Sequence, residues 1–228
     1  MFFVSNWTSP EYWLAVLYRV PAILFALSAH ECAHAWAAYK AGDPTARNLG
    51  RITLDPTKHL DLFGTICLLL FGFGWAKPVP INSRNFKHGR KDNVWVSLSG
   101  ILTNLLLSFV FSLVLYISVL GGATNAIYIN ILIPFIYINI ALAVFNLIPI
   151  PPLDGFQFIS GLFFRKAARA VNVLNRYGFI ILVILMITGV IGTILGYVSG
   201  FLVNAYDGLF SLFAPDARGL LPYVLAFG

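Results

Sequence analysis

The sequence predicts an all-α polytopic membrane protein, on the basis of its composition, its hydropathy and its long apolar stretches. Hydrophobic residues make up 59% of the 228 residues, charged residues make up 11%, and the mean hydropathy is +0.82. An ordinary soluble domain is about 45–50% apolar and about 25% charged. These values exclude a disordered protein, a nucleic-acid-binding module and a disulfide-stapled secreted domain. The lipid bilayer is therefore the expected environment.

Apolar stretches long enough to cross a bilayer lie at about 12–40, 94–120, 126–148 and 178–203. A shorter apolar stretch covers 60–75, and the stretch 205–225 is interrupted by glycine and proline. We expect one membrane domain over 1–228, with a core at 12–165, C-terminal helices at 178–228 and about four to six spans. The sequence leaves the oligomeric state open.

The net charge of +6 indicates the orientation of these spans. Basic residues gather in three loops, at 40–58, 77–91 and 165–176, whereas the loop 121–125 carries no charge. Because basic loops stay in the cytoplasm, the loop 121–125 is expected outside. This orientation holds only if 60–75 enters the membrane and returns on the same side. Its shortness and its glycines favour such a re-entrant segment; if it crosses instead, one basic loop breaks the rule.

Two segments between the first two long spans are typical of short strands. In WAKPVPINSRNF, at 75–86, Pro78 and Pro80 exclude a helix interior, and Val79 and Ile81 alternate with other residues. Proline confines such a strand to a sheet edge. The segment 51–55 is a second candidate strand, so we expect a small sheet at the cytoplasmic face.

The first span contains the sequence His30-Glu31-Cys32-Ala33-His34. On a helix, positions i and i+4 lie on one face, so two imidazoles can bind one metal ion while Glu31 reaches the water that the metal activates. His30 lies ten residues before Lys40, which places it about 15 Å inside the expected cytoplasmic boundary. The alternative is that His30, Glu31 and His34 line a polar pathway in a transporter, or pair with each other.

The third long span ends in NLIPIPPLDG, at 146–155, where three prolines interrupt the helix next to Asp154. Irregular backbone at membrane depth is tolerated where it is buried in protein or lines a wet cavity. The first and third spans run in the same direction, so both motifs arrive at similar depth. His30, His34 and Asp154 then form a three-ligand site with a fourth position open, as in catalytic zinc sites, although iron or cobalt also suits these ligands. A plain turn at Asp154 is the alternative.

These motifs resemble those of the site-2 protease family of intramembrane zinc metalloproteases (peptidase family M50), in its compact prokaryotic form without a PDZ or CBS domain. HECAH matches the family's H-E-x-x-H, and NLIPIPPLDG matches its N-x-x-P-x-x-x-L-D-G. The stretch FGWAKPVPINSRNF resembles the G-W-A-K-P-V-P stretch of the compact group. SLSGILTN, at 97–104, resembles a G-P-x-x-N segment, with Ile101 where proline is usual. The resemblance covers about 28–155.

The resemblance implies a core of three transmembrane helices with a re-entrant segment and short strands. It implies Zn²⁺ as cofactor, His30, His34 and Asp154 as its ligands, and Glu31 as general base and acid. Asn146 would bind the substrate backbone or support the oxyanion, or else cap the broken helix. Asn104, on a small-residue helix face, is more typical of a helix–helix contact.

The implied reaction is hydrolysis of peptide bonds in transmembrane proteins near the cytoplasmic side, in a prokaryotic plasma membrane (regulated intramembrane proteolysis). An unwound substrate could add to the edge strand at Lys77, Val79 and Ile81. The rival functions are a cation transporter, which usually shows internal repeats that this sequence lacks, and a catalytically silent relative that binds membrane helices, against which the intact Glu31 argues.

Overall fold

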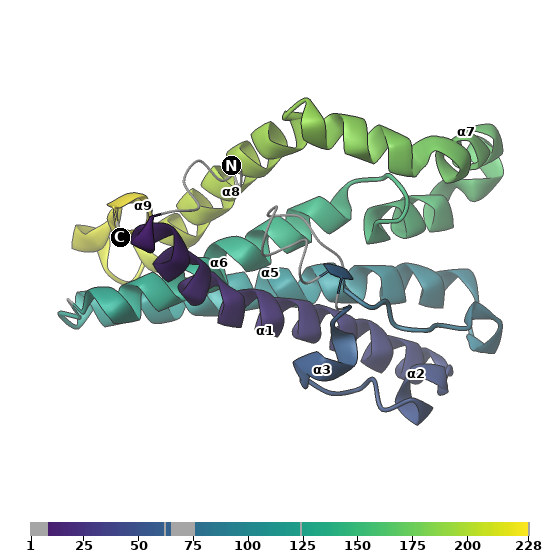
Figure 1. Cartoon of the computed structure of the whole chain (residues 1–228), viewed down its shortest axis with the longest axis horizontal. Helices are drawn as coiled ribbons and strands as arrows, with labels where there is room; N and C mark the ends of the chain where they lie inside the picture. The colour runs from purple at the N-terminus through teal and green to yellow at the C-terminus, as the bar shows by residue number, and fades with distance from the viewer. Residues whose placement is uncertain (1–8, 62, 65–75, 124, 228) are drawn as a thin grey trace.

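The computed structural model describes residues 9–61, 63–64, 76–123 and 125–227. Helices dominate this part of the chain (Figure 1). The long helices are α1 (Pro10–Ala41), α5 (Arg90–Leu120), α6 (Ala126–Leu147), α7 (Asp154–Ile187) and α8 (Val190–Phe210). The short helices are α2 (Thr45–Asn48), α3 (Pro56–His59), α9 (Leu220–Phe227) and the 3-10 turns η1 (Ser83–Asn85) and η2 (Pro215–Ala217). The all-α prediction is therefore confirmed.

Three helices, α1, α5 and α6, are each long and apolar enough to cross a membrane. They lie side by side and match the stretches predicted at 12–40, 94–120 and 126–148 (Figure 1). Small residues on α1 permit this close packing, because Ala22, Ala26 and Ala29 are buried against the neighbouring helices. Counted with the α7–α8 pair, the described residues hold up to four candidate spans, which is the lower end of the expected range.

The apolar stretch predicted at 178–203 does not form one straight helix. The chain bends by 73° between α7 and α8 at a break after Ile187, so only the bent pair passes the length and hydropathy test for a span. Gly189 has a φ of 78°, a left-handed conformation that glycine adopts without strain. The elbow packs inward, where Leu182 and Ile191 bury against Leu153.

Helices α8 and α9 pack against the C-terminal half of α5 and against α6. Phe210 of α8 and Leu221 of α9 share a buried cluster with Leu115 and Ile136. Asp207 accepts hydrogen bonds from the backbone N–H groups of Gly219 and Leu221, which joins α8 to the start of α9. With eight residues, α9 is too short to cross a bilayer.

The predicted small sheet is not formed in the described residues. Neither 51–55 nor 76–86 is a strand there, and the region keeps a single antiparallel bridge between Leu60 and Ala76. The physical reason is a shortage of free donors. Pro78 and Pro80 have no N–H, and the Val79 N–H binds Glu31, so after the Lys77 N–H, which binds the His59 carbonyl in this bridge, the segment has no N–H left for pairing as far as Pro80. The re-entrant prediction at 60–75 lies mostly outside the described residues.

Candidate metal centre

The two histidines of the HECAH motif lie on the buried face of α1. His30 and His34 are 5% and 6% exposed, and their rings meet edge to face with centroids 4.7 Å apart. The spacing of four residues places both side chains over the same stretch of helix. Ala35, Ala37 and Ala38 are also buried in this part of α1, so neighbouring elements approach the helix closely around the histidine pair.

The break between α6 and α7 delivers Asp154 to the same place. Three prolines in 148–153 prevent α6 from continuing beyond Leu147, and α7 begins at Asp154 itself. A side chain at Gly155 would collide with the Leu147 carbonyl, so glycine at that position lets the two helix ends approach. The interruption predicted from the prolines is confirmed, and the Asp154 carboxylate turns toward the histidines.

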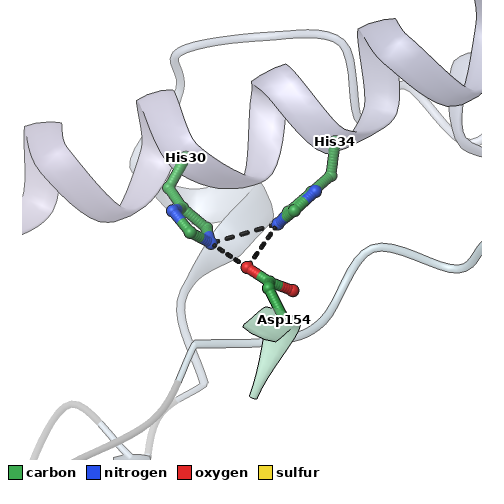
Figure 2. Close-up of side chains that lie close together, drawn as sticks. All are labelled: His30, His34 and Asp154. Carbon is green, nitrogen blue, oxygen red and sulfur yellow. Dashed lines mark hydrogen bonds and ion pairs between the residues drawn. The ribbon is translucent and has the colours of Figure 1, made fainter. Parts of the chain in front are cut away.

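The three side chains meet through their metal-binding atoms (Figure 2). The His30 Nε2 and His34 Nε2 atoms are 3.1 Å apart, and each lies 3.0 Å from the Asp154 Oδ2 atom. In a tetrahedral zinc site with bonds of about 2.1 Å, neighbouring ligand atoms are about 3.4 Å apart. The side chain of Asp154 is 21% exposed, so the group is open on that side.

The hydrogen bonds of the outer ring nitrogens fit a metal centre. His34 Nδ1 lies 2.8 Å from the Val96 carbonyl oxygen, and His30 Nδ1 lies 2.5 Å from Asn104 Oδ1. Since these oxygens accept, each Nδ1 donates, so a neutral ring carries its lone pair on Nε2. Three electron-pair donors then face one another at 3.0–3.1 Å, an arrangement that a shared cation stabilises.

Glu31 is held by the segment 76–86, which contains Val79. The Val79 N–H donates to Glu31 Oε2 over 3.0 Å. Because Pro78 and Pro80 carry no N–H, Val79 supplies the single backbone donor of this Pro-Val-Pro tripeptide. Val79 is itself buried against Ala35 and Ala46. The two motifs that the sequence placed apart, HECAH and KPVPI, are thus in direct contact.

The other predicted substrate-binding residues form their hydrogen bonds away from the three metal-binding side chains. Lys77 and Ile81 are exposed, and the Lys77 carbonyl accepts a hydrogen bond from Arg51. Asn146 is half-buried and donates from Nδ2 to the Leu142 carbonyl of its own helix over 3.0 Å. These geometries leave the predicted roles of Lys77, Ile81 and Asn146 as predictions.

Two residues at the centre escaped the sequence analysis. Gly100 of α5 packs directly on both imidazoles, because a Cβ there would lie 2.5 Å from His30 Cε1 and 2.6 Å from His34 Nε2. Asn139 of α6 is fully buried and bonds to Asn104. The sequence could have pointed to Asn139, because an amide side chain within a strongly apolar helix costs free energy unless it has a polar partner.

Comparisons with known proteins agree with the motifs. The model for peptidase family M50 matches residues 116–185, which contain Asn146 and Asp154. YwhC of Bacillus subtilis is 40% identical over 90% of this chain and 94% of its own length. Rip2 of Mycolicibacterium smegmatis is 28% identical over 72% of this chain and 64% of its own length. Rip3 of Mycobacterium tuberculosis is 28% identical over 91% of this chain and 47% of its own length.

All three relatives are named as zinc metalloproteases, and in each case the name is an assignment and not an established activity. No solved structure matches this chain significantly. The likeness to YwhC extends over nearly the whole of both proteins. This chain therefore belongs to peptidase family M50, the family that its two motifs resemble.

Proposed function

We propose that this protein is an intramembrane zinc metalloprotease that hydrolyses peptide bonds of transmembrane substrates near the cytoplasmic side of a prokaryotic plasma membrane. The carrying observation is the convergence of His30, His34 and Asp154, whose ligand atoms lie 3.0–3.1 Å from one another. Two imidazoles and one carboxylate form the donor set of catalytic zinc sites that keep a fourth position open. The names of the relatives support the choice of zinc and of proteolysis.

The position of the centre supports a membrane-embedded substrate. His30 and His34 lie within α1, one of the three helices able to cross a membrane, and the helix continues to Ala41. The basic residues of 40–58 follow directly, and they favour the cytoplasm for that end. The scissile bond would therefore reach the site below the bilayer surface. A helical substrate must unwind there, because helix hydrogen bonds cover its peptide groups.

Each residue at the centre has a distinct part in the proposed hydrolysis. His30, His34 and Asp154 would hold a zinc ion, which would lower the pKa of a water and polarise the substrate carbonyl. Glu31 accepts a proton on Oε1 and returns it to the leaving amine, because Oε2 is held by the Val79 N–H. Asn104 and the Val96 carbonyl hold the outer nitrogens of His30 and His34. Asn146 would bind the substrate backbone after releasing the carbonyl of Leu142.

The test is a comparison of wild type with Glu31→Gln, purified in detergent. We expect wild type to retain about one zinc per chain and to cleave a model transmembrane peptide. Glu31→Gln should retain the zinc and lose cleavage by at least about a hundredfold, since the amide cannot take a proton. Bound cation without cleavage in either protein would favour a transporter, and absence of bound zinc in wild type would reject the proposal.

The segment Lys77–Ile81 also has a proposed role in binding an extended substrate. Since the N–H groups of Lys77 and Val79 are engaged, an added peptide would donate its own N–H groups to the carbonyls of Pro78, Val79 or Pro80. The Val79 N–H itself would position Glu31.

Positioning of Glu31 and binding of an extended substrate can be distinguished by their effects on kcat and KM. Val79→Pro removes the N–H and should lower kcat about 10–100-fold, the cost of a hydrogen bond to a charged group, with zinc content unchanged. Val79→Ala keeps the N–H and should retain kcat. If Val79→Pro raises KM alone, the segment serves substrate addition without positioning Glu31.

A further inference from the structure

A chain of buried amides leads from the metal centre into the helix bundle. His30 Nδ1 on α1 lies 2.5 Å from Asn104 Oδ1 on α5. Asn104 Nδ2 donates over 2.8 Å to Asn139 Oδ1 on α6, and also to the Ala26 carbonyl at 3.3 Å. Asn139 Nδ2 donates over 2.7 Å to the Phe135 carbonyl. Both asparagines are 0% exposed, so these amides lie inside the bundle and depend on hydrogen bonds there.

The last acceptor of this chain fixes the direction of every bond in it. The Phe135 carbonyl only accepts, so the amide nitrogen of Asn139 faces it and the amide oxygen faces Asn104. Asn104 must then present its nitrogen to Asn139 and its oxygen to His30. His30 consequently donates from Nδ1, and its Nε2 lone pair points at Asp154 and His34. The backbone carbonyl of Phe135 on α6 thus determines the tautomer of the His30 imidazole on α1.

The two histidines are supported in different ways. His34 Nδ1 donates to the Val96 carbonyl, a backbone group that every residue type provides. His30 depends on a side chain, Asn104, whose orientation depends on a second side chain, Asn139. Burying two amides inside apolar helices costs free energy unless all their groups are paired. Here the amide oxygens and nitrogens of Asn104 and Asn139 are paired within one network that includes His30.

We propose that Asn104 and Asn139 are positioning residues of the metal centre, and that together they fix the tautomer and ring orientation of His30 for zinc binding. This inference rests on the proposed zinc site and assigns a role to Asn139, which lies outside both sequence motifs. Partners of the outer nitrogen of a ligating histidine typically change metal affinity by about 10–100-fold when they are removed. A simple helix–helix contact between α5 and α6 would not require Asn104 to present its oxygen to His30.

The experiment measures zinc affinity by chelator competition, together with thermal unfolding, on detergent-purified full-length variants. Asn104→Leu and Asn139→Leu should each weaken zinc binding, the former by about 10–100-fold. Asn104→Asp keeps an oxygen toward His30 but removes the donor to Asn139 and Ala26, so it should unfold at a lower temperature and yet bind zinc nearly as tightly as wild type. The matched control is Ser108→Ala, one turn further along α5, where a fully buried hydroxyl contacts Tyr206; it should leave zinc affinity unchanged.

The outcomes separate this inference from the proposed function. Wild-type zinc affinity for Asn139→Leu, or an equal loss of affinity in Asn104→Asp and Asn104→Leu, would overturn the positioning role while leaving the zinc site intact. If wild type itself binds no zinc, the proposed function fails first. Should Asn104→Leu not fold, Asn139→Leu and Asn104→Asp still decide the question.

Discussion

Gly100 is the residue at which the packing of the metal centre is most sensitive to one added carbon. A Cβ at this position would lie 2.5 Å from His30 Cε1 and 2.6 Å from His34 Nε2, well inside van der Waals contact. We expect Gly100→Ala to displace one or both imidazoles and to reduce the zinc content of the purified protein severalfold or more. Zinc measured by atomic absorption against protein concentration checks this directly.

A second glycine provides the control for Gly100→Ala. Gly196 lies inside α8, and a Cβ there would meet nothing within 4 Å. Gly196→Ala should leave zinc binding unchanged and stabilise the helix by about 0.5–1 kcal/mol, because alanine loses less conformational entropy than glycine. Equal zinc content in the two variants would show that the close approach at Gly100 tolerates a methyl group.

At the residue scale, the sequence predicted the residues that carry chemistry better than those that hold them. His30, His34 and Asp154 could be grouped from motif spacing and span direction, and the structure brings them together. The role of Val79 as a donor to Glu31 could not be read, because it depends on which way one N–H points. Asn104 was interpreted as a helix–helix contact, and it does reach α6 as well as His30.

The segment between α1 and α5 is fastened to the end of α1 by Asp43. This fully buried carboxylate accepts hydrogen bonds from Thr45, from the Asn82 N–H at 2.7 Å and from Asn85 Nδ2 at 2.8 Å. Burial opposes its ionisation, but these hydrogen bonds outweigh burial and lower the pKa of Asp43 below its ordinary value. The same segment carries Val79, so the hydrogen bonds of Asp43 help to hold the Val79 N–H that donates to Glu31.

The lowered pKa of Asp43 predicts the direction of a pH dependence. The folded form prefers the ionised carboxyl, so its stabilising contribution is complete above about pH 4, the unfolded-state value, and is lost as pH falls through the lower folded-state pKa. Asp43→Asn should lower the free energy of unfolding by about 1.5–3 kcal/mol at neutral pH, and the gap to wild type should narrow in acid. Thermal unfolding in detergent across about pH 6 to pH 3 measures that gap.

The matched control for Asp43→Asn is Asp216→Asn, which changes an exposed carboxyl in η2. It should leave the unfolding temperature close to that of wild type throughout the pH range. A gap between Asp43→Asn and wild type that stays constant as pH falls would contradict the assignment of this pH dependence to Asp43.

At the scale of elements, hydropathy was sufficient for α1, α5 and α6, because lipid-spanning helices must be long and apolar wherever they pack. It did not reveal the bend within 178–203, since both arms of the elbow are apolar and the bend depends on the left-handed Gly189 and on packing against Leu153. It also failed for the strands, because alternation of side chains does not reveal that the Val79 N–H is already bound to Glu31.

For the whole molecule, the α7–α8 elbow connects the metal centre to the opposite end of the bundle. Near the centre, Leu182 and Ile191 cover Leu153, the residue before Asp154. At the other end, Tyr116 of α5 packs against Phe210 of α8, with ring centroids 5.2 Å apart. Helix α8 thus runs from the level of Leu153 to the level of Tyr116 on α5, and we expect the α7–α8 pair to cross the membrane once.

A single crossing by α7 and α8 predicts which side of the membrane each loop faces. Gly121 follows α5, and Asp216 follows α8; both are exposed. Both should face the outside, whereas the exposed Lys91 at the start of α5 should face the cytoplasm. Single cysteines at these three positions, in a Cys32→Ser, Cys67→Ser background, can be labelled in intact cells with a membrane-impermeant maleimide.

We expect Gly121→Cys and Asp216→Cys to react in intact cells, and Lys91→Cys to react only after permeabilisation. Retained zinc in each variant would control for the fold. Labelling of Asp216→Cys solely after permeabilisation would mean that the elbow enters the membrane and returns to the cytoplasm. In that arrangement the cluster that joins Phe210 and Leu221 to Leu115 could not form at the outer end of α5. The measurement therefore tests the packing of the C-terminal helices as well as the topology.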